Sequence, residues 1–313
     1  MRRYLISAAI GGLVCSFSAH AAEILVGGPQ GVPARLNLGT GEMQFIGSCG
    51  DSIAGISMVG GDMFIAGVNG SIYDFDVQNS VIEQVFDVTT DISTMVAHKG
   101  QLWIASEDGT IRRVSPTSGQ VLNTYSSPEP VWAVTAYGDH VYATGPNAAI
   151  YRASDADGVF SYFTCSCFPA VNSITATDQK LYLVTTNNQF WTIDRANGQP
   201  LAAWFLPFTG TAVQAVEEKV IIGGAIGQLI TISPESGDFQ EHEFAPVQIE
   251  AIALFAPSDC LEDLSGDESV DLVDLSILLA AFGPGSGGDI NGDAQTDLTD
   301  LSMLLASFGT TCE

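Results

Sequence analysis

The residues best suited to chemistry are acidic and lie near the C-terminal end of the chain. Two twelve-residue segments, 263–274 and 289–300, carry oxygen-bearing side chains at matching positions, and the second starts 26 residues after the first. Calcium takes six to eight oxygen ligands, and a tight loop can point alternate residues inward together. The pattern therefore predicts two calcium sites, one in each segment. Their expected ligands are Asp263, Ser265, Asp267, Ser269, Asp271, Asp274, Asp289, Asn291, Asp293, Gln295, Asp297 and Asp300.

The sixth position of each loop departs from the usual calcium-binding pattern. EF-hand loops have glycine there for the sharp turn, whereas this chain has Glu268 and Ala294. A side chain on a residue with positive φ costs roughly 1 kcal/mol, which predicts weakened calcium binding. The alternative is an acidic linker with two amphipathic helices and no metal. Two copies in the same register favour the calcium loops.

An apolar stripe follows each loop at the spacing i, i+3, i+4, i+7, which is typical of one face of a helix. The two stripes consist of Leu275, Leu278, Leu279 and Phe282, and of Leu301, Leu304, Leu305 and Phe308. Two such stripes are too small to form a core alone. We therefore expect the helices to face each other, with the metal ions holding the loops.

The duplicated loop and helix resemble a type I dockerin. The resemblance rests on the paired loops and on the ending Asp-Leu-x-x-Leu-Leu-x-x-Phe-Gly at 274–283 and 300–309. It implies a small α-helical, EF-hand-like domain at 258–313 that attaches the protein to a cohesin-like or other extracellular protein. Family partner contacts lie at loop positions 10 and 11, here Leu272-Val273 and Leu298-Thr299, without the Ser-Thr pairs of cellulosomal members.

The N-terminus has the features of an export signal. Arg2 and Arg3 precede a short apolar stretch at 5–14, and Ala19-His20-Ala21 has the small-x-small form of a cleavage site. We therefore expect a signal peptide at 1–21 and a secreted or cell-surface protein. An N-terminal anchor helix is the alternative, but the apolar stretch is too short to span a bilayer, and no later stretch is long and apolar enough to be a membrane helix.

Five cysteines follow the expected cleavage site: Cys49, Cys165, Cys167, Cys260 and Cys312. An odd number leaves at least one without a partner in its own chain. Cys260 and Cys312 flank the two loops, whose ends should meet in a two-fold helix pair, so we expect a disulfide between them. Cys165 and Cys167 either form a local bridge or remain as two thiols.

The sequence between 22 and 257 repeats six times. Short apolar strands begin at Glu23, Asp62, Gln101, His140, Lys180 and Lys219, spaced 39, 39, 39, 40 and 39 residues apart. A period near forty is the signature of a propeller blade, so we predict a mostly β protein with a six-bladed β-propeller. The last apolar strand, 249–255, should complete the blade that the first three strands begin. The alternatives are a pair of β-sandwiches and an open solenoid.

The repeats are similar in architecture to quinoprotein-like and kelch-like blades. Gly27-Gly28 and Gly223-Gly224 match the kelch double glycine, but the kelch tryptophan is missing. The net charge of −26 argues against nucleic acid, because phosphate binding needs clustered Lys and Arg.

No catalytic grouping stands out in the repeats. Asp51, Asp91 and Glu129 fall in loops around one mouth of the expected channel, where they could bind a metal, act as acid and base, or be solvated. His98 and His140 fall at turns, where we expect exposed side chains.

Three functions follow from this organisation. In the first, the propeller is a non-catalytic module that recognises a glycan or protein, and the tail attaches it to a partner. In the second, the propeller is a hydrolase, lyase or lactonase in polysaccharide breakdown, with Asp51, Asp91 or Glu129 as catalytic candidates. In the third, it is a structural repeat that only displays the tail.

Overall fold

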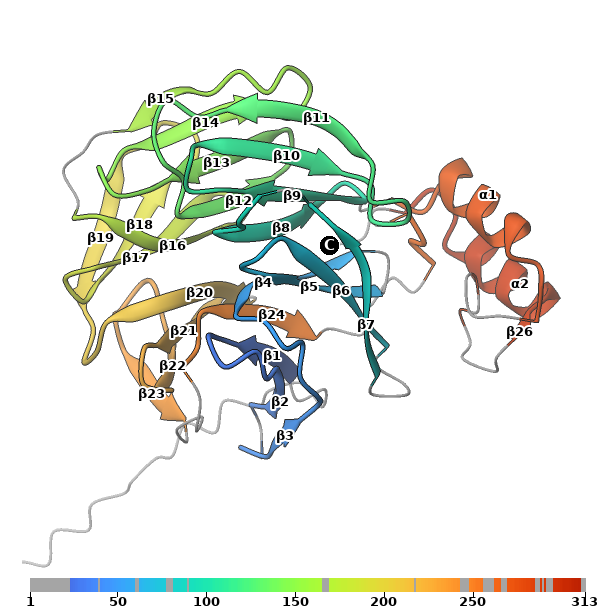
Figure 1. Ribbon diagram of the computed structural model, residues 1–313, viewed down its shortest axis with the longest axis horizontal. Helices are drawn as coiled ribbons and strands as arrows, with labels where there is room; N and C mark the ends of the chain where they lie inside the picture. Colours follow the sequence, from blue (N-terminus) through green and yellow to red (C-terminus); the bar gives the residue numbers. More distant parts are fainter. Residues whose placement is uncertain are drawn as a thin grey trace, which may run out of the picture.

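The computed structural model describes residues 23–38, 40–59, 62–76, 81–88, 90–164, 169–216, 218–242, 248–255, 262–265, 269–284, 288, 290 and 295–310. Within these residues, short antiparallel strands account for most of the chain up to residue 255, and two helices follow (Figure 1). The expected signal peptide lies outside the described residues.

The strands form six four-stranded antiparallel sheets, written here from the inner to the outer strand. Blade 1 contains β24 (Ala251–Phe255), β1 (Glu23–Gly27), β2 (Ala34–Asn37) and β3 (Met43–Phe45). Blade 2 contains β4 (Ile53–Val59), β5 (Asp62–Gly67), β6 (Ser71–Asp76) and β7 (Val81–Asp87). Blade 3 contains β8 (Thr94–His98), β9 (Gln101–Ala105), β10 (Thr110–Val114) and β11 (Val121–Ser126).

The other three blades repeat this order. Blade 4 contains β12 (Ala133–Tyr137), β13 (His140–Thr144), β14 (Ile150–Ser154) and β15 (Ser161–Thr164). Blade 5 contains β16 (Val171–Ala176), β17 (Lys180–Thr185), β18 (Gln189–Asp194) and β19 (Pro200–Phe205). Blade 6 contains β20 (Gly210–Val216), β21 (Lys219–Gly224), β22 (Leu229–Ile232) and β23 (Phe239–His242).

The six inner strands contact one another in turn around a central axis, in the order β24, β4, β8, β12, β16, β20 (Figure 1). The ring is closed by β24, which pairs with β1 from Glu23 opposite Phe255 to Gly27 opposite Ala251. This closure joins the two ends of the propeller in one sheet and removes an open edge. The predicted six-bladed propeller is confirmed, and the sandwich and solenoid alternatives are wrong.

The turn eight residues after each repeat start keeps a left-handed backbone in all six blades. Ala148 and Asn188 take φ of 60° and 62° at positions where the other four repeats have glycine with positive φ. Asparagine adopts this conformation more readily than alanine, because its short polar side chain can hydrogen-bond to the nearby backbone. The turn geometry is therefore conserved across the repeats even where the residue is not glycine.

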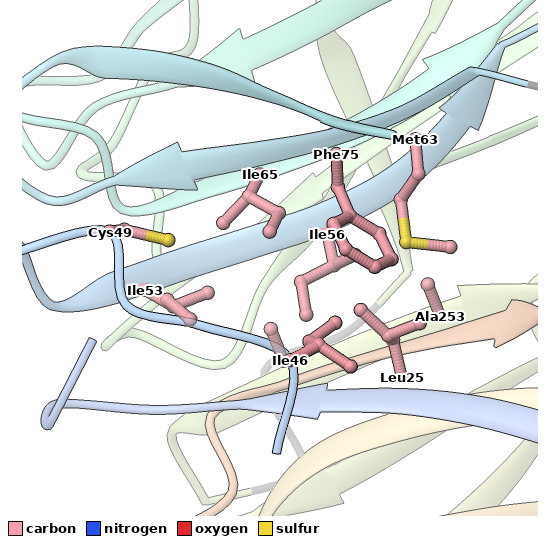
Figure 2. Packing of buried hydrophobic residues seen from close by; sticks show 10 residues of the cluster. Leu25, Ile46, Cys49, Ile53, Ile56, Met63, Ile65, Phe75 and Ala253 are labelled. Atoms are coloured by element: carbon pink, nitrogen blue, oxygen red, sulfur yellow. The ribbon is translucent and has the colours of Figure 1, made fainter. Parts of the chain in front are cut away.

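Blades are held together by apolar side chains from facing sheets. Between blades 1 and 2, Leu25 and Ala253 meet Ile56, Met63 and Phe75 in one buried cluster (Figure 2). The inner strands add polar links between blades, because Ser93 Oγ donates to the Val131 carbonyl at 2.7 Å and Asn172 Nδ2 to the Gly210 carbonyl at 2.8 Å. Each of these bonds spans 38 residues, one blade of the repeat.

The C-terminal helices α1 (Leu272–Ala280) and α2 (Leu298–Ala306) pack against each other around four buried side chains. These are Val270, Leu278, Ile290 and Leu304. The segment after each helix bonds to the segment before the other helix. After α1, β25 (Gly283–Pro284) pairs with β26 (Gln295–Thr296), and after α2, residues 309–310 bond to Val270. A helix is present at each predicted place, but it begins within the loop, at Leu272 or Leu298, rather than after it. No helix within the described residues is long and apolar enough to cross a membrane.

Candidate functional site

The two acidic loops precede two helices of equal length that repeat each other at a separation of 26 residues. The structure describes Asp263, Ser265, Ser269, Asp271 and Asp274 of the first loop, and Gln295, Asp297 and Asp300 of the second. The four other expected ligands, Asp267, Asp289, Asn291 and Asp293, lie outside the described residues.

The last two acids of each loop also begin a helix. Asp271 is the N-cap of α1 and accepts a hydrogen bond from the Val273 N–H at 2.6 Å, while Asp274 accepts one from the Asp271 N–H at 2.7 Å. Asp297 and Asp300 repeat this capping box in α2. Such boxes satisfy the unpaired N–H groups of a first helical turn. Part of the acidic pattern thus has a structural purpose that does not require metal.

The twelfth-position carboxylates also reach back across their loops. Asp274 Oδ1 accepts the Ser265 N–H at 2.7 Å, and Asp300 Oδ1 accepts the Ile290 N–H at 2.8 Å. Both carboxylates are fully buried, with 0 % of their surface exposed. A capping box needs only the bond back to the N-cap. The second bond therefore closes each loop around a buried carboxylate.

The local electrostatics favour a bound cation. The segment 258–313 contains twelve Asp and Glu residues and no Lys, Arg or His. A buried carboxylate is costly without a positive partner, and the oxygen-rich donor set is what calcium prefers. Within the described part of the chain, no three His, Cys, Asp or Glu side chains form a group that could hold a metal. The residues present fit calcium in chemistry, and the calcium sites stay a prediction.

The apolar stripes are only half buried, which corrects the sequence prediction. Leu278 and Leu304 are fully buried, and Leu275 and Leu301 pack against them. Leu279 and Leu305 are each 53 % exposed, and Phe282 and Phe308 are also exposed. Each helix has only nine residues and ends before the phenylalanine of its stripe, and a single buried position per turn faces the partner helix. The remaining apolar residues of the stripes, Leu279 with Phe282 and Leu305 with Phe308, are exposed at equivalent positions of the two copies.

The three carboxylates at the loop face of the propeller have separate surroundings. Asp51 accepts hydrogen bonds from the N–H and the side-chain amide of Asn69, at 3.0 and 2.9 Å, and so fixes the β5–β6 turn. Asp91 is exposed. Glu129 Oε1 accepts the Tyr151 hydroxyl at 2.8 Å, and burial together with this bond raises the pKa of Tyr151 to about 12. At least two of these acids thus order neighbouring turns or strands.

One expected surface histidine is buried. His98, at the end of β8, is 8 % exposed, and its Nε2 lies 3.5 Å from Asp155 Oδ2 in blade 4. The neighbouring Lys99 contacts Asp155 at 2.9 Å and Asp139 at 2.7 Å. The prediction of an exposed turn histidine was wrong at this position, because the next blade covers it. These charges link blades 3 and 4 on the face opposite the candidate carboxylates.

The cysteines contribute no described disulfide. Cys49 is a buried free thiol, and burial, followed by the charge of Asp51, raises its pKa to about 11. Cys165, Cys167, Cys260 and Cys312 lie outside the described residues. The Cys260–Cys312 disulfide therefore stays a prediction.

Two comparisons with known proteins bear on the propeller. A family model described as outer membrane protein assembly factor BamB matches residues 107–248, less than half of the chain. A chain in the crystal structure of a nidogen/laminin complex superposes with a TM-score of 0.68 at 11% identity, over 75% of this chain and 98% of that chain. At this identity the likeness shows the fold alone. No curated protein matches the chain.

The matches agree with a propeller similar to that of the BamB family, and the family match ends before the helix pair.

Sequence reasoning missed two contributors to the acidic loops. The double role of Asp271 as loop residue and N-cap is visible in the spacing Asp-x-x-Asp. The backbone N–H of Ser265, which bonds to Asp274, carried no signal, because it does not depend on a distinctive side chain.

Proposed function

We propose that this chain is an exported, calcium-binding protein whose helix pair is a dockerin-like attachment domain and whose propeller is a non-catalytic recognition module. The observation that carries the proposal is the buried, loop-closing carboxylate, present twice, at Asp274 and Asp300. An acidic segment without basic side chains needs an external cation to hold such carboxylates together.

The exposed apolar surfaces support the attachment role. Leu272 and Leu298 are each 72 % exposed at equivalent helix starts, and they occupy the loop position that contacts partners in dockerins. Large exposed apolar side chains repeated in two copies are typical of a docking surface. Since acids surround them, the matching partner surface is apolar at its centre and basic at its rim. This chemistry fits a cohesin-like or other extracellular protein.

A non-catalytic propeller is supported by the way its candidate acids are used. Asp51 and Glu129 hold neighbouring protein groups, and within the described residues they do not join a metal-binding group. The enzyme alternative is tested by turnover of polysaccharides. An enzyme loses turnover in Asp51→Ala, Asp91→Ala or Glu129→Ala variants that stay folded, whereas a recognition module retains a glycan or protein without forming product.

Calorimetric titration of the whole protein with calcium tests the metal proposal. We expect two calcium ions to bind per chain, and Asp274→Asn and Asp300→Asn each to abolish or strongly weaken one of them. Asn keeps the shape of Asp but not its charge. Asp238→Asn, in an exposed propeller turn, is the matched control and should bind two ions. No heat of binding, together with the same hydrogen exchange at 269–310 in EDTA and in calcium, would refute the proposal.

Partner attachment has a separate readout. We expect the wild-type protein to retain a protein from the surface fraction of the producing cells in calcium and to release it in chelator. The Leu272→Asp/Leu298→Asp double variant should bind calcium and retain nothing. If it retains the same protein as the wild type, the helix pair is not the attachment surface.

A further inference from the structure

We propose that the β8–β9 turn of the propeller is a docking site for the first acidic loop, and that calcium binding by this loop is linked to the seating of the helix pair on blades 2 and 3. The inference rests on the proposed function, because it assigns a further contact to the same calcium loop.

The contact point is Gly100, and any other residue at this position would push the acidic loop away from the turn. Gly100 has φ of +67°, and a Cβ added to it would lie 2.4 Å from the carbonyl oxygen of Ser265. A carbon and an oxygen cannot approach so closely without repulsion, so the loop lies against the bare backbone of the turn. The turn thus accepts this loop only because it has no side chain there.

The residue that meets the propeller is also bonded to two acids of its own loop. Ser265 is the third residue of the first loop; its N–H bonds to Asp274 at 2.7 Å and its hydroxyl to Asp263 at 3.2 Å. Both carboxylates are expected calcium ligands. A change in how they hold Ser265 therefore moves the carbonyl that touches Gly100.

Beside this contact, the described part of the junction contains a cavity, which leaves the seating weak enough to be shifted. A cavity of about 440 Å³ separates the two parts. The propeller wall includes Val59, Phe64 and Leu122, and the tail wall includes Leu264, Val273 and Ile277. A tightly packed junction would hold regardless of metal, whereas an open one depends on a few contacts and on charge.

Charge gives the linkage its direction. Asp62 of blade 2 lines the cavity, and its pKa is raised by burial and by the nearby charges of Asp74 and Asp76. Lys99 also lines the cavity, but its ammonium group is engaged by Asp139 and Asp155. A loop without metal would bring further negative charge to this wall. Calcium removes that repulsion, and by reciprocity a seated loop binds calcium more tightly.

The test compares two glycines in equivalent propeller turns. Gly100→Val blocks the contact with Ser265, while Gly138→Val, at φ of +58°, has only the Arg195 Nη1 atom nearby, at 3.7 Å from an added Cβ. Both glycines have positive φ, of 67° and 58°, so both substitutions carry backbone strain. We expect Gly100→Val to weaken one of the two calcium sites at least about fivefold, the lower range of an allosteric coupling. Gly138→Val should titrate as the wild type does.

Small-angle X-ray scattering measures the seating directly. In the wild type and Gly138→Val, chelator should increase the radius of gyration and calcium should reverse the increase. Gly100→Val should keep the larger value in both conditions.

A second pair of variants covers the case in which Gly100→Val does not fold. Leu122 lines the cavity from the exposed strand β11, and the adjacent Val121 is exposed but does not line it. Leu122→Asp adds a negative charge to the cavity wall and should weaken the same calcium site, whereas Val121→Asp should not. Because both positions are exposed, neither substitution disturbs the core.

The outcomes separate this inference from the proposed function. If the wild type binds no calcium, the proposed function fails. If the wild type binds two ions and the folded Gly100→Val or Leu122→Asp variant binds both with unchanged affinity and an unchanged radius of gyration, the docking inference is overturned and the proposed function stands.

Discussion

Leu278→Ala should destabilise the helix pair far more than Leu279→Ala, although the two leucines are neighbours in α1. Leu278 is fully buried in a core of four side chains, whereas Leu279 is 53 % exposed. Truncating a buried leucine costs about 2–5 kcal/mol, and a surface change usually stays within about 0.5 kcal/mol. Both substitutions keep a strong helix former, so helix propensity does not separate them.

The assay is hydrogen exchange of the whole protein, read in peptides that cover 269–310. With calcium at a hundred times its dissociation constant, binding restores about 2.7 kcal/mol per site, so Leu278→Ala should be protected in calcium and largely unprotected in EDTA. Leu279→Ala should exchange like the wild type in both conditions. Equal exchange of the two variants would show that the helices do not pack through the buried face described above.

Other parts of the molecule give three further expectations. Gly158→Ala would place a Cβ 2.0 Å from the Tyr125 ring, whereas Gly41→Ala, also at positive φ, meets no atom within 4 Å. Gly158→Ala should therefore lower the free energy of unfolding in urea by about 1–3 kcal/mol more than Gly41→Ala does. Equal losses would contradict the blade packing. Burial outweighs a nearby carboxylate and lowers the pKa of His98. As the pH drops below about 6.5, the unfolded chain is protonated at this histidine before the folded chain is, so the stability of the fold should decrease. The decrease should be smaller in His98→Asn, and an equal decrease would contradict burial of a neutral histidine. Cys49, whose pKa is raised to about 11, should resist alkylation at pH 8 until the protein unfolds, as mass spectrometry of the labelled peptide can show.

Much of the fold could be predicted because its signals are local and repeated. The strand starts at Glu23, Asp62 and Gln101 agree with the first residues of β1, β5 and β9. The blade closure was also predictable, since one apolar strand was left over at the end of the repeats. Each of these inferences needs only alternation, turn residues and a period.

The errors concern burial, which depends on neighbours from distant segments. The spacing of Leu279 and Phe282 is correct for a helix face, but α1 ends at Ala280, before Phe282, and α2 leaves Leu279 exposed. His98 sits at a turn by sequence, yet the next blade brings Asp155 beside it, 57 residues further on. No local pattern contains that contact.

By itself, the sequence determined the six blades, the two helices and the positions of the acidic residues, because hydrophobic period and turn chemistry act between near neighbours. Only the tertiary structure decided that Asp274 and Asp300 become fully buried and that Ser265 meets Gly100. Burial and close approach arise from how separate segments pack, and the free energy of a carboxylate depends on the surroundings that this packing creates.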